Sequence, residues 1–174
     1  LDDTLDKDDA ILIVREQGVG DEILFSSLYK DLINFYPNTK IECDSRLINI
    51  FKRSFNKDIF YEFGFFTSST EKLKYFDKVL YAGSLTKYFR RDIKQFIQGP
   101  YIKSDKSKDA DIAAQISKFN KTKKIGISWK SVFNIYGGLK SLKLEDFHKI
   151  FNNKITIFKI QYGDVDDDLK KLNN

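Results

Sequence analysis

Residues 16–22 (EQGVGDE) form a loop that combines glycine with acidic side chains, between an apolar run and an amphipathic segment. Glycines let the backbone approach a ligand closely, and a carboxylate beside such a turn can accept a proton from a hydroxyl group. The third glycine of the dinucleotide-binding fingerprint is replaced by Ile23, and acidic residues at a helix start repel a pyrophosphate. Asp21 is therefore either a general base or the cap of the following helix.

A second loop of interest spans residues 129–131 (WKS) and 136–141 (YGGLKS). Serine hydroxyls, glycine N–H groups and lysines ahead of a helix can cradle a diphosphate. The alternative is a flexible basic loop beside a partly buried Trp129. The residue types alone leave both interpretations open.

Short apolar runs alternate with amphipathic segments, a pattern that predicts βαβ units and a parallel sheet. The expected strands are residues 10–14, 39–43, 58–63, 78–82, 124–129 and 155–160. The expected helices are residues 22–35, 47–54, 85–97, 109–119 and 144–151, with a short helix after Asp164. In the first helix, Leu24, Leu28 and Leu32 recur at i+4 spacing and are expected to face the core.

The alternation of strands and helices stops before residues 101–110 and restarts after them, which indicates two lobes. We expect a Rossmann-like lobe at 1–100, a linker at 101–110 and the start of a second Rossmann-like lobe at 111–174. The second lobe would hold only two strands, so we expect a chain cut from a longer polypeptide. The lack of any Met and of a basic, apolar leader agrees with this expectation and with a cytoplasmic location.

The composition excludes several classes of protein and of binding site. The 174 residues are 41% hydrophobic and 15% aromatic, as in a globular protein, and no apolar run is long enough to span a membrane. The single Cys43 excludes a disulfide within the chain and a cysteine metal cluster, and we expect it to be buried. The single His148 is expected on the surface, so we predict no metal site. The net charge of +5 is spread along the chain, which disfavours a nucleic-acid interface.

Several segments, in order, resemble motifs of the heptosyltransferase-like glycosyltransferases, in particular bacterial members fused to tetratricopeptide repeats. Residues 11–32 (ILIVREQGVGDEILFSSLYKDL) resemble the family's opening strand, glycine turn and helix. Residues 81–92 (YAGSLTKYFRRD) and 100–105 (PYIKSD) are similar to the segment that ends its first lobe. The remaining matches are residues 123–131 (KKIGISWKS), 139–151 (LKSLKLEDFHKIF) and 157–164 (IFKIQYGD).

The resemblance implies the GT-B architecture, in which the acceptor binds the first lobe and a nucleotide-sugar binds the second. Asp21 matches the family's general base, in an acceptor loop that also holds Gln17, Gly18 and Gly20. The positions that match the donor side are Trp129, Ser131, Lys140, Ser141 and Gln161. Lys140 stands where many relatives carry Arg, which keeps the charge and loses the bidentate geometry.

The implied reaction is an inverting, metal-independent transfer from a nucleotide-sugar to a hydroxyl of a sugar or protein, with no cofactor. The implied partners are that donor, that acceptor and upstream tetratricopeptide repeats. The family's nucleotide-gripping segment has no counterpart here, so we expect residues 1–174 alone to bind donor weakly and to turn over little. A non-catalytic binding module with this fold is the main alternative, followed by a basic nucleic-acid-binding domain.

Overall fold

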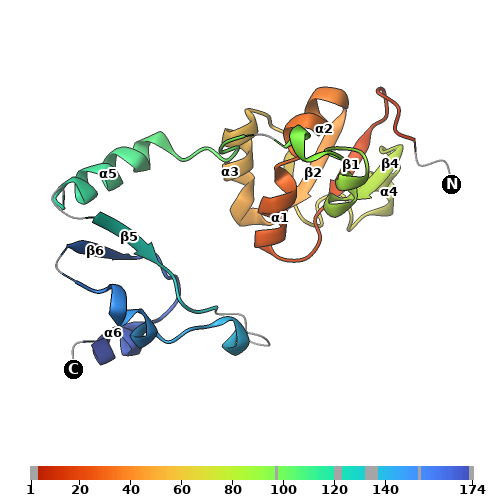
Figure 1. The fold of residues 1–174 in the computed structure, drawn as a ribbon. Helices are drawn as coiled ribbons and strands as arrows, with labels where there is room; N and C mark the ends of the chain where they lie inside the picture. The colour runs from red at the N-terminus through yellow and green to blue at the C-terminus, as the bar shows by residue number, and fades with distance from the viewer. Residues whose placement is uncertain (1–3, 97, 120–122, 132–136, 153, 173–174) are drawn as a thin grey trace. The chain divides into compact units, whose positions relative to one another are not determined.

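The protein was analysed as a computed structural model that describes residues 4–96, 98–119, 123–131, 137–152 and 154–172. The chain divides into two compact units, one running to Lys106 and the other starting at Ser107 (Figure 1). The division falls inside the segment expected as a linker. The early part of that segment packs on the first unit, because the backbone of Lys103 hydrogen-bonds the side chains of Arg53 and Ser54, both at 2.9 Å.

The first unit contains a parallel sheet of four strands in the order β3-β2-β1-β4. These strands are β1 (Ile11–Val14), β2 (Thr39–Cys43), β3 (Phe60–Glu62) and β4 (Lys78–Tyr81). All four residues of β1 are buried, as expected for a central strand covered on both faces. The predicted Rossmann-like α/β arrangement is thus present in the first unit.

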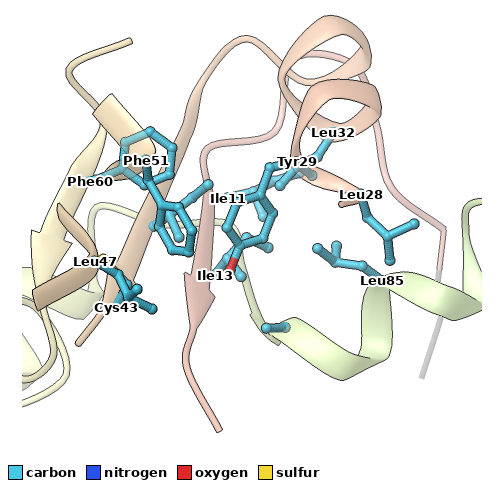
Figure 2. Close-up of a cluster of buried hydrophobic side chains, with 12 residues drawn as sticks. Ile11, Ile13, Leu28, Tyr29, Leu32, Cys43, Leu47, Phe51, Phe60 and Leu85 are labelled. Atoms are coloured by element: carbon cyan, nitrogen blue, oxygen red, sulfur yellow. The ribbon is translucent and has the colours of Figure 1, made fainter. Parts of the chain in front are cut away.

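The helices that flank this sheet are α1 (Val19–Ser26), α2 (Tyr29–Phe35), α3 (Ser45–Phe55) and α4 (Thr70–Leu73), with 3-10 turns η1 (Ala82–Lys87) and η2 (Ile93–Gln95). Apolar side chains of α1, α2, α3 and η1 and those of the strands form one core (Figure 2). Tyr29 reaches from α2 toward Phe51 of α3, with ring centroids 5.7 Å apart. Cys43 is fully buried in this core, as predicted.

The predicted helix 22–35 is two helices, because the chain breaks between α1 and α2. The carbonyl of Ser27 accepts a hydrogen bond from the buried side chain of Arg90. The prediction that Leu24 faces the core was wrong, since Leu24 is 62% exposed. The buried face of α1 carries Glu22 and Ser26 instead, and Leu24 lies on another face of the helix.

The predicted helix 85–97 was also wrong as a continuous element. The structure has the 3-10 turn η1 and then a bend at Arg90, whose φ of 56° is in the left-handed region. A left-handed residue cannot continue a right-handed helix. The side chain of Arg90 compensates by pairing with Asp31 of α2 at 2.9 Å.

The second unit pairs two parallel strands, β5 (Lys123–Ile127) and β6 (Ile155–Lys159). The helical segments of this unit are α5 (Lys106–Ser117), η3 (Gly138–Lys140), η4 (Leu144–Ile150) and α6 (Asp166–Leu172). Its small core consists of Ile127, Trp129, Leu144 and Val165. His148 lies exposed on η4, as predicted. No helix in the described residues is long and apolar enough to cross a membrane.

Candidate functional site

The strand order of the first sheet reverses at β1. From β1 the chain moves to β2 and β3 on one side and returns to β4 on the other. The segment after β4, η1, packs against α1, so the loops that follow β1 and β4 lie against each other. Ligands of open α/β sheets bind at the carboxyl ends of the strands where the strand order reverses. The predicted acceptor loop follows β1 directly, which places it at this point.

The turn that carries Asp21 is held by hydrogen bonds within the loop. The Asp21 carboxylate accepts from the N–H of Gly18 at 3.1 Å, as in a capping box. Gln17 has a left-handed φ of 61°, and its carbonyl accepts from the guanidinium of Arg15 at 2.9 Å. A side chain on Gly20 would meet nothing within 4 Å, so crowding does not demand glycine there. Asp21 therefore caps α1, and this role does not depend on whether it also acts as a general base.

A set of charged groups lies beneath this turn. The Nε of Arg15 lies 2.9 Å from the carboxylate of Glu22, a residue that is 1% exposed. The second oxygen of Glu22 accepts from the N–H of Asp44 at 2.9 Å. Burial still dominates and raises the pKa of Glu22, which the N–H of Asp44 and then the charge of Arg15 partly offset.

Asp44, directly after β2, is an N-cap for α3 and also binds Arg46 through both carboxylate oxygens, at 2.8 and 2.9 Å. The hydrogen bonds from the Arg46 side chain hold the pKa of Asp44 well below its usual range. Arg15 approaches the same carboxylate at 3.4 Å. These charged groups therefore hold together the loops that follow β1 and β2.

Glu16 is a residue of this edge that sequence reasoning left without a role. Its carboxylate lies against the backbone of Gly83, where an added Cβ would be 2.9 Å from Oε1. Val14 pairs with Tyr81, so Glu16 and Gly83 each lie two residues beyond the end of the β1–β4 ladder. The only signal in the sequence was its place at the head of the EQGVGD turn.

In the second unit, the predicted donor residues Gln161 and Trp129 are brought together. The Gln161 carbonyl oxygen accepts from the backbone N–H groups of Trp129 and Lys130, at 2.9 and 3.0 Å, and from Ser128. Its amide nitrogen donates to the carbonyls of Lys130 and Tyr162. Gln161 is 5% exposed and joins the carboxyl ends of β5 and β6.

The predicted pair Ser131 and Ser141 is also brought together, since the N–H of Ser131 donates to the Ser141 hydroxyl at 3.0 Å. Lys140 lies exposed in η3, and no contact joins it to Gln161. Residues 132–136 of the same loop lie outside the described residues. Asp168 of α6, which sequence reasoning missed, accepts from Trp129 Nε1 at 2.9 Å and pairs with Lys130 at 3.1 Å.

An open cavity of about 410 Å³ lies at this end of the second unit. Its lining is rich in lysine and includes Lys130, Lys143 and Lys171, together with Ser141 and two acidic residues, Glu145 and Asp168. The hydrogen bond from Trp129, and then that from Lys130, lowers the pKa of Asp168. Lysines and a serine hydroxyl suit an anionic group, while the two carboxylates limit how much negative charge the cavity accepts.

Comparison with known proteins gives one distant similarity. No family model and no solved structure matches the chain. A curated protein of Caulobacter vibrioides, Protein FlbA, is 24% identical over 176 residues, covering 91% of this chain and 29% of FlbA. The chain thus spans less than a third of the length of this relative.

Proposed function

We propose that this chain acts in a glycosyltransferase of the GT-B type, which moves a sugar from a nucleotide-sugar to a hydroxyl acceptor. The observation that carries the proposal is the position of Asp21, in a glycine turn at the switch point of a parallel sheet. The order of the heptosyltransferase-like motifs along the chain supports it. The lysine-bearing cavity at the carboxyl end of the second parallel pair also supports a donor side.

In the proposed reaction, Asp21 accepts the proton of the acceptor hydroxyl as that oxygen attacks the anomeric carbon. The bond from that carbon to the nucleoside diphosphate breaks, with inversion. Lys140 and neighbouring backbone N–H groups balance the charge that develops on the departing diphosphate. The first unit would thus bind the acceptor and the second unit the donor.

The replacement Asp21→Asn separates the catalytic role from the capping role. An asparagine oxygen can still accept from the Gly18 N–H, so we expect an unchanged melting temperature. In a full-length version of the protein, loss of general-base catalysis should lower turnover about 100-fold or more, measured as nucleotide released from UDP-, GDP-, ADP- or CMP-sugars. Unchanged turnover would leave Asp21 as a helix cap alone.

A non-catalytic binding module remains the second candidate, because the Asp21 carboxylate already has a structural partner in Gly18. A thermal-shift screen of a full-length version against UDP, GDP, ADP and CMP distinguishes the two, since a ligand that binds only the folded state raises the melting temperature. A saturable rise with one nucleotide supports the transferase. Carbohydrate binding without any nucleotide response supports the module.

A further inference from the structure

A cavity of about 330 Å³ in the first unit lies among the helices, away from the turn that carries Asp21. Its lining comes from α2, from the end of α3 with the residues after it, and from residues 100–103. α2 leads into the start of β2, and Lys57 stands between α3 and the start of β3. In a parallel sheet such junctions lie at the amino ends of the strands, so the cavity lies toward the edge opposite the glycine turn.

Lysine side chains supply the charge of this cavity. Lys30, Lys57 and Lys103 line it, and its lining contains no carboxylate. In the part of the chain that the structure describes, none of these three ammonium groups has a hydrogen bond or an ion pair. Three like charges at one cavity repel one another, and an anion between them would remove that repulsion.

The carboxylates that adjoin two of these lysines in the chain are bound elsewhere. Asp31 pairs with Arg90 at 2.9 Å, and Asp58 pairs with Lys52 at 2.5 Å. The cavity of the second unit differs, because two carboxylates lie among its lysines. The cavity of the first unit is therefore the better match for a ligand with more than one negative charge.

Hydrogen bonds fix the walls of this cavity. The N–H of Lys103 donates to the buried hydroxyl of Ser54 at 2.9 Å, and that hydroxyl donates to the carbonyl of Ile50 at 2.7 Å. The phenol of Tyr101 donates to the carbonyl of Ile23 at 2.7 Å. The segment that closes the cavity is thus held to both α1 and α3.

The lining is apolar as well as cationic, because Ile33, Phe55 and Pro100 lie among the lysines. We propose that the cavity binds a small phosphorylated molecule, whose phosphate pairs with the lysines and whose apolar part packs on these three side chains. A phosphate carries more charge than a carboxylate and accepts from several ammonium groups at once. The volume falls in the usual range for small-molecule sites, about 300–1,000 Å³. The site does not depend on the proposed transferase function.

The test measures the binding of phenyl phosphate to residues 1–174 by titration calorimetry, with inorganic phosphate and phenol as partial probes. Phenyl phosphate should bind more tightly than either, because each partial probe matches only one part of the lining. Its Kd should rise with added NaCl, since the lysines are exposed to solvent and their charges are screened.

Lys57→Gln and Lys103→Gln should each raise the Kd of phenyl phosphate about fivefold, and the double variant about 25-fold. The matched control is Lys94→Gln, which removes an exposed lysine of η2 outside the cavity and should leave the Kd unchanged. All three lysines are exposed, so the variants should keep the melting temperature of the wild-type chain.

Absence of phenyl phosphate binding overturns the inference. Equal affinity for phenol, or an unchanged Kd in the double variant, also overturns it, because the lysines would then be solvated surface groups. Phosphatidylglycerol vesicles and a single-stranded oligonucleotide distinguish other sources of phosphate. Lysine-dependent binding of either one, without binding of phenyl phosphate, assigns the site to a membrane or a nucleic acid and rules out the small molecule.

Discussion

The two units hold the carboxyl ends of their parallel strands by different means. The first unit uses charges, with Arg15 between the buried Glu22 and Asp44. The second unit uses a neutral amide, with Gln161 joining the ends of β5 and β6 through its oxygen and nitrogen. A buried charge carries a desolvation cost that depends on pH, whereas an amide does not titrate. We therefore expect the stability of the first unit to depend on pH more strongly than that of the second unit.

The chain contains a separate probe for each unit. Cys43, its single cysteine, is buried in the first core, where burial raises the pKa of its thiol to about 12. Trp129, its single tryptophan, is 4% exposed in the second. Thiol labelling in denaturant thus reports opening of the first unit, and tryptophan fluorescence reports unfolding of the second.

The largest effect is expected from Arg15→Met, which keeps the apolar stem and removes the charge beside Glu22. Leaving that carboxylate buried without a cation should lower the stability of the first unit by about 3 kcal/mol at pH 7. The folded-state pKa of Glu22 is already raised above 4.5 and should rise further. The penalty is therefore present above the folded pKa and is relieved as pH falls toward 4.5, where Glu22 takes up a proton.

Cys43 labelling in urea at pH 7 and pH 5 measures this effect. Arg91→Met is the matched control, because Arg91 is exposed, its guanidinium donates to the carbonyl of Lys87, and its charge is not among those that shift the pKa of Glu22. An equal loss in both variants, or a loss that does not change with pH, would contradict the charge-based account of the first edge.

A smaller, pH-independent loss is expected from Gln161→Ala. Removal of the amide leaves the buried N–H of Trp129 without its acceptor, at a cost of about 2 kcal/mol to the second unit. The midpoint of the Trp129 fluorescence transition should fall by the same amount at pH 5 and pH 7. The control is Gln115→Ala on the exposed side of α5, which should move neither transition. A shift of the Cys43 transition in Gln161→Ala would show that the two units unfold together.

The smallest effect concerns Asp168, whose carboxylate accepts the hydrogen bond from Trp129 Nε1. Its folded pKa lies below 3.8, so its contribution is complete above pH 3.8 and disappears as pH falls through the folded value. Trp129 fluorescence should therefore change below pH 3.8, and Asp168→Asn should remove that change. Asp167→Asn should retain the change in fluorescence, because Asp167 pairs with Lys170 at the surface.

Much of the fold could be predicted from local patterns. The continuous apolar run that became β1 predicted a central strand, and the alternation of strands and helices predicted a parallel sheet. The errors came where a distant partner changed a local preference. Arg90 interrupts the helix expected at 22–35, and the burial of Glu22 turned Leu24 to the surface. Arg90 lies 63 residues along the chain from the carbonyl that it binds, and Glu22 lies 22 residues from the N–H of Asp44 that binds it, so both partners are outside the window that helical periodicity uses.

The candidate site, too, could be predicted in part from local patterns, and the rest depended on contacts between distant residues. The sequence by itself determined that a glycine turn with three acidic residues follows a central strand, and that a serine- and lysine-bearing loop follows β5. Only the tertiary structure decided that Glu22 is buried beside Asp44 and that Glu16 lies against Gly83. The cap that Asp21 forms on α1 is local, because its donor is the N–H of Gly18 in the same turn. The physical reason is that the state of a carboxylate depends on the groups around it, and Asp44 and Gly83 follow strands that are far from the glycine turn in the chain.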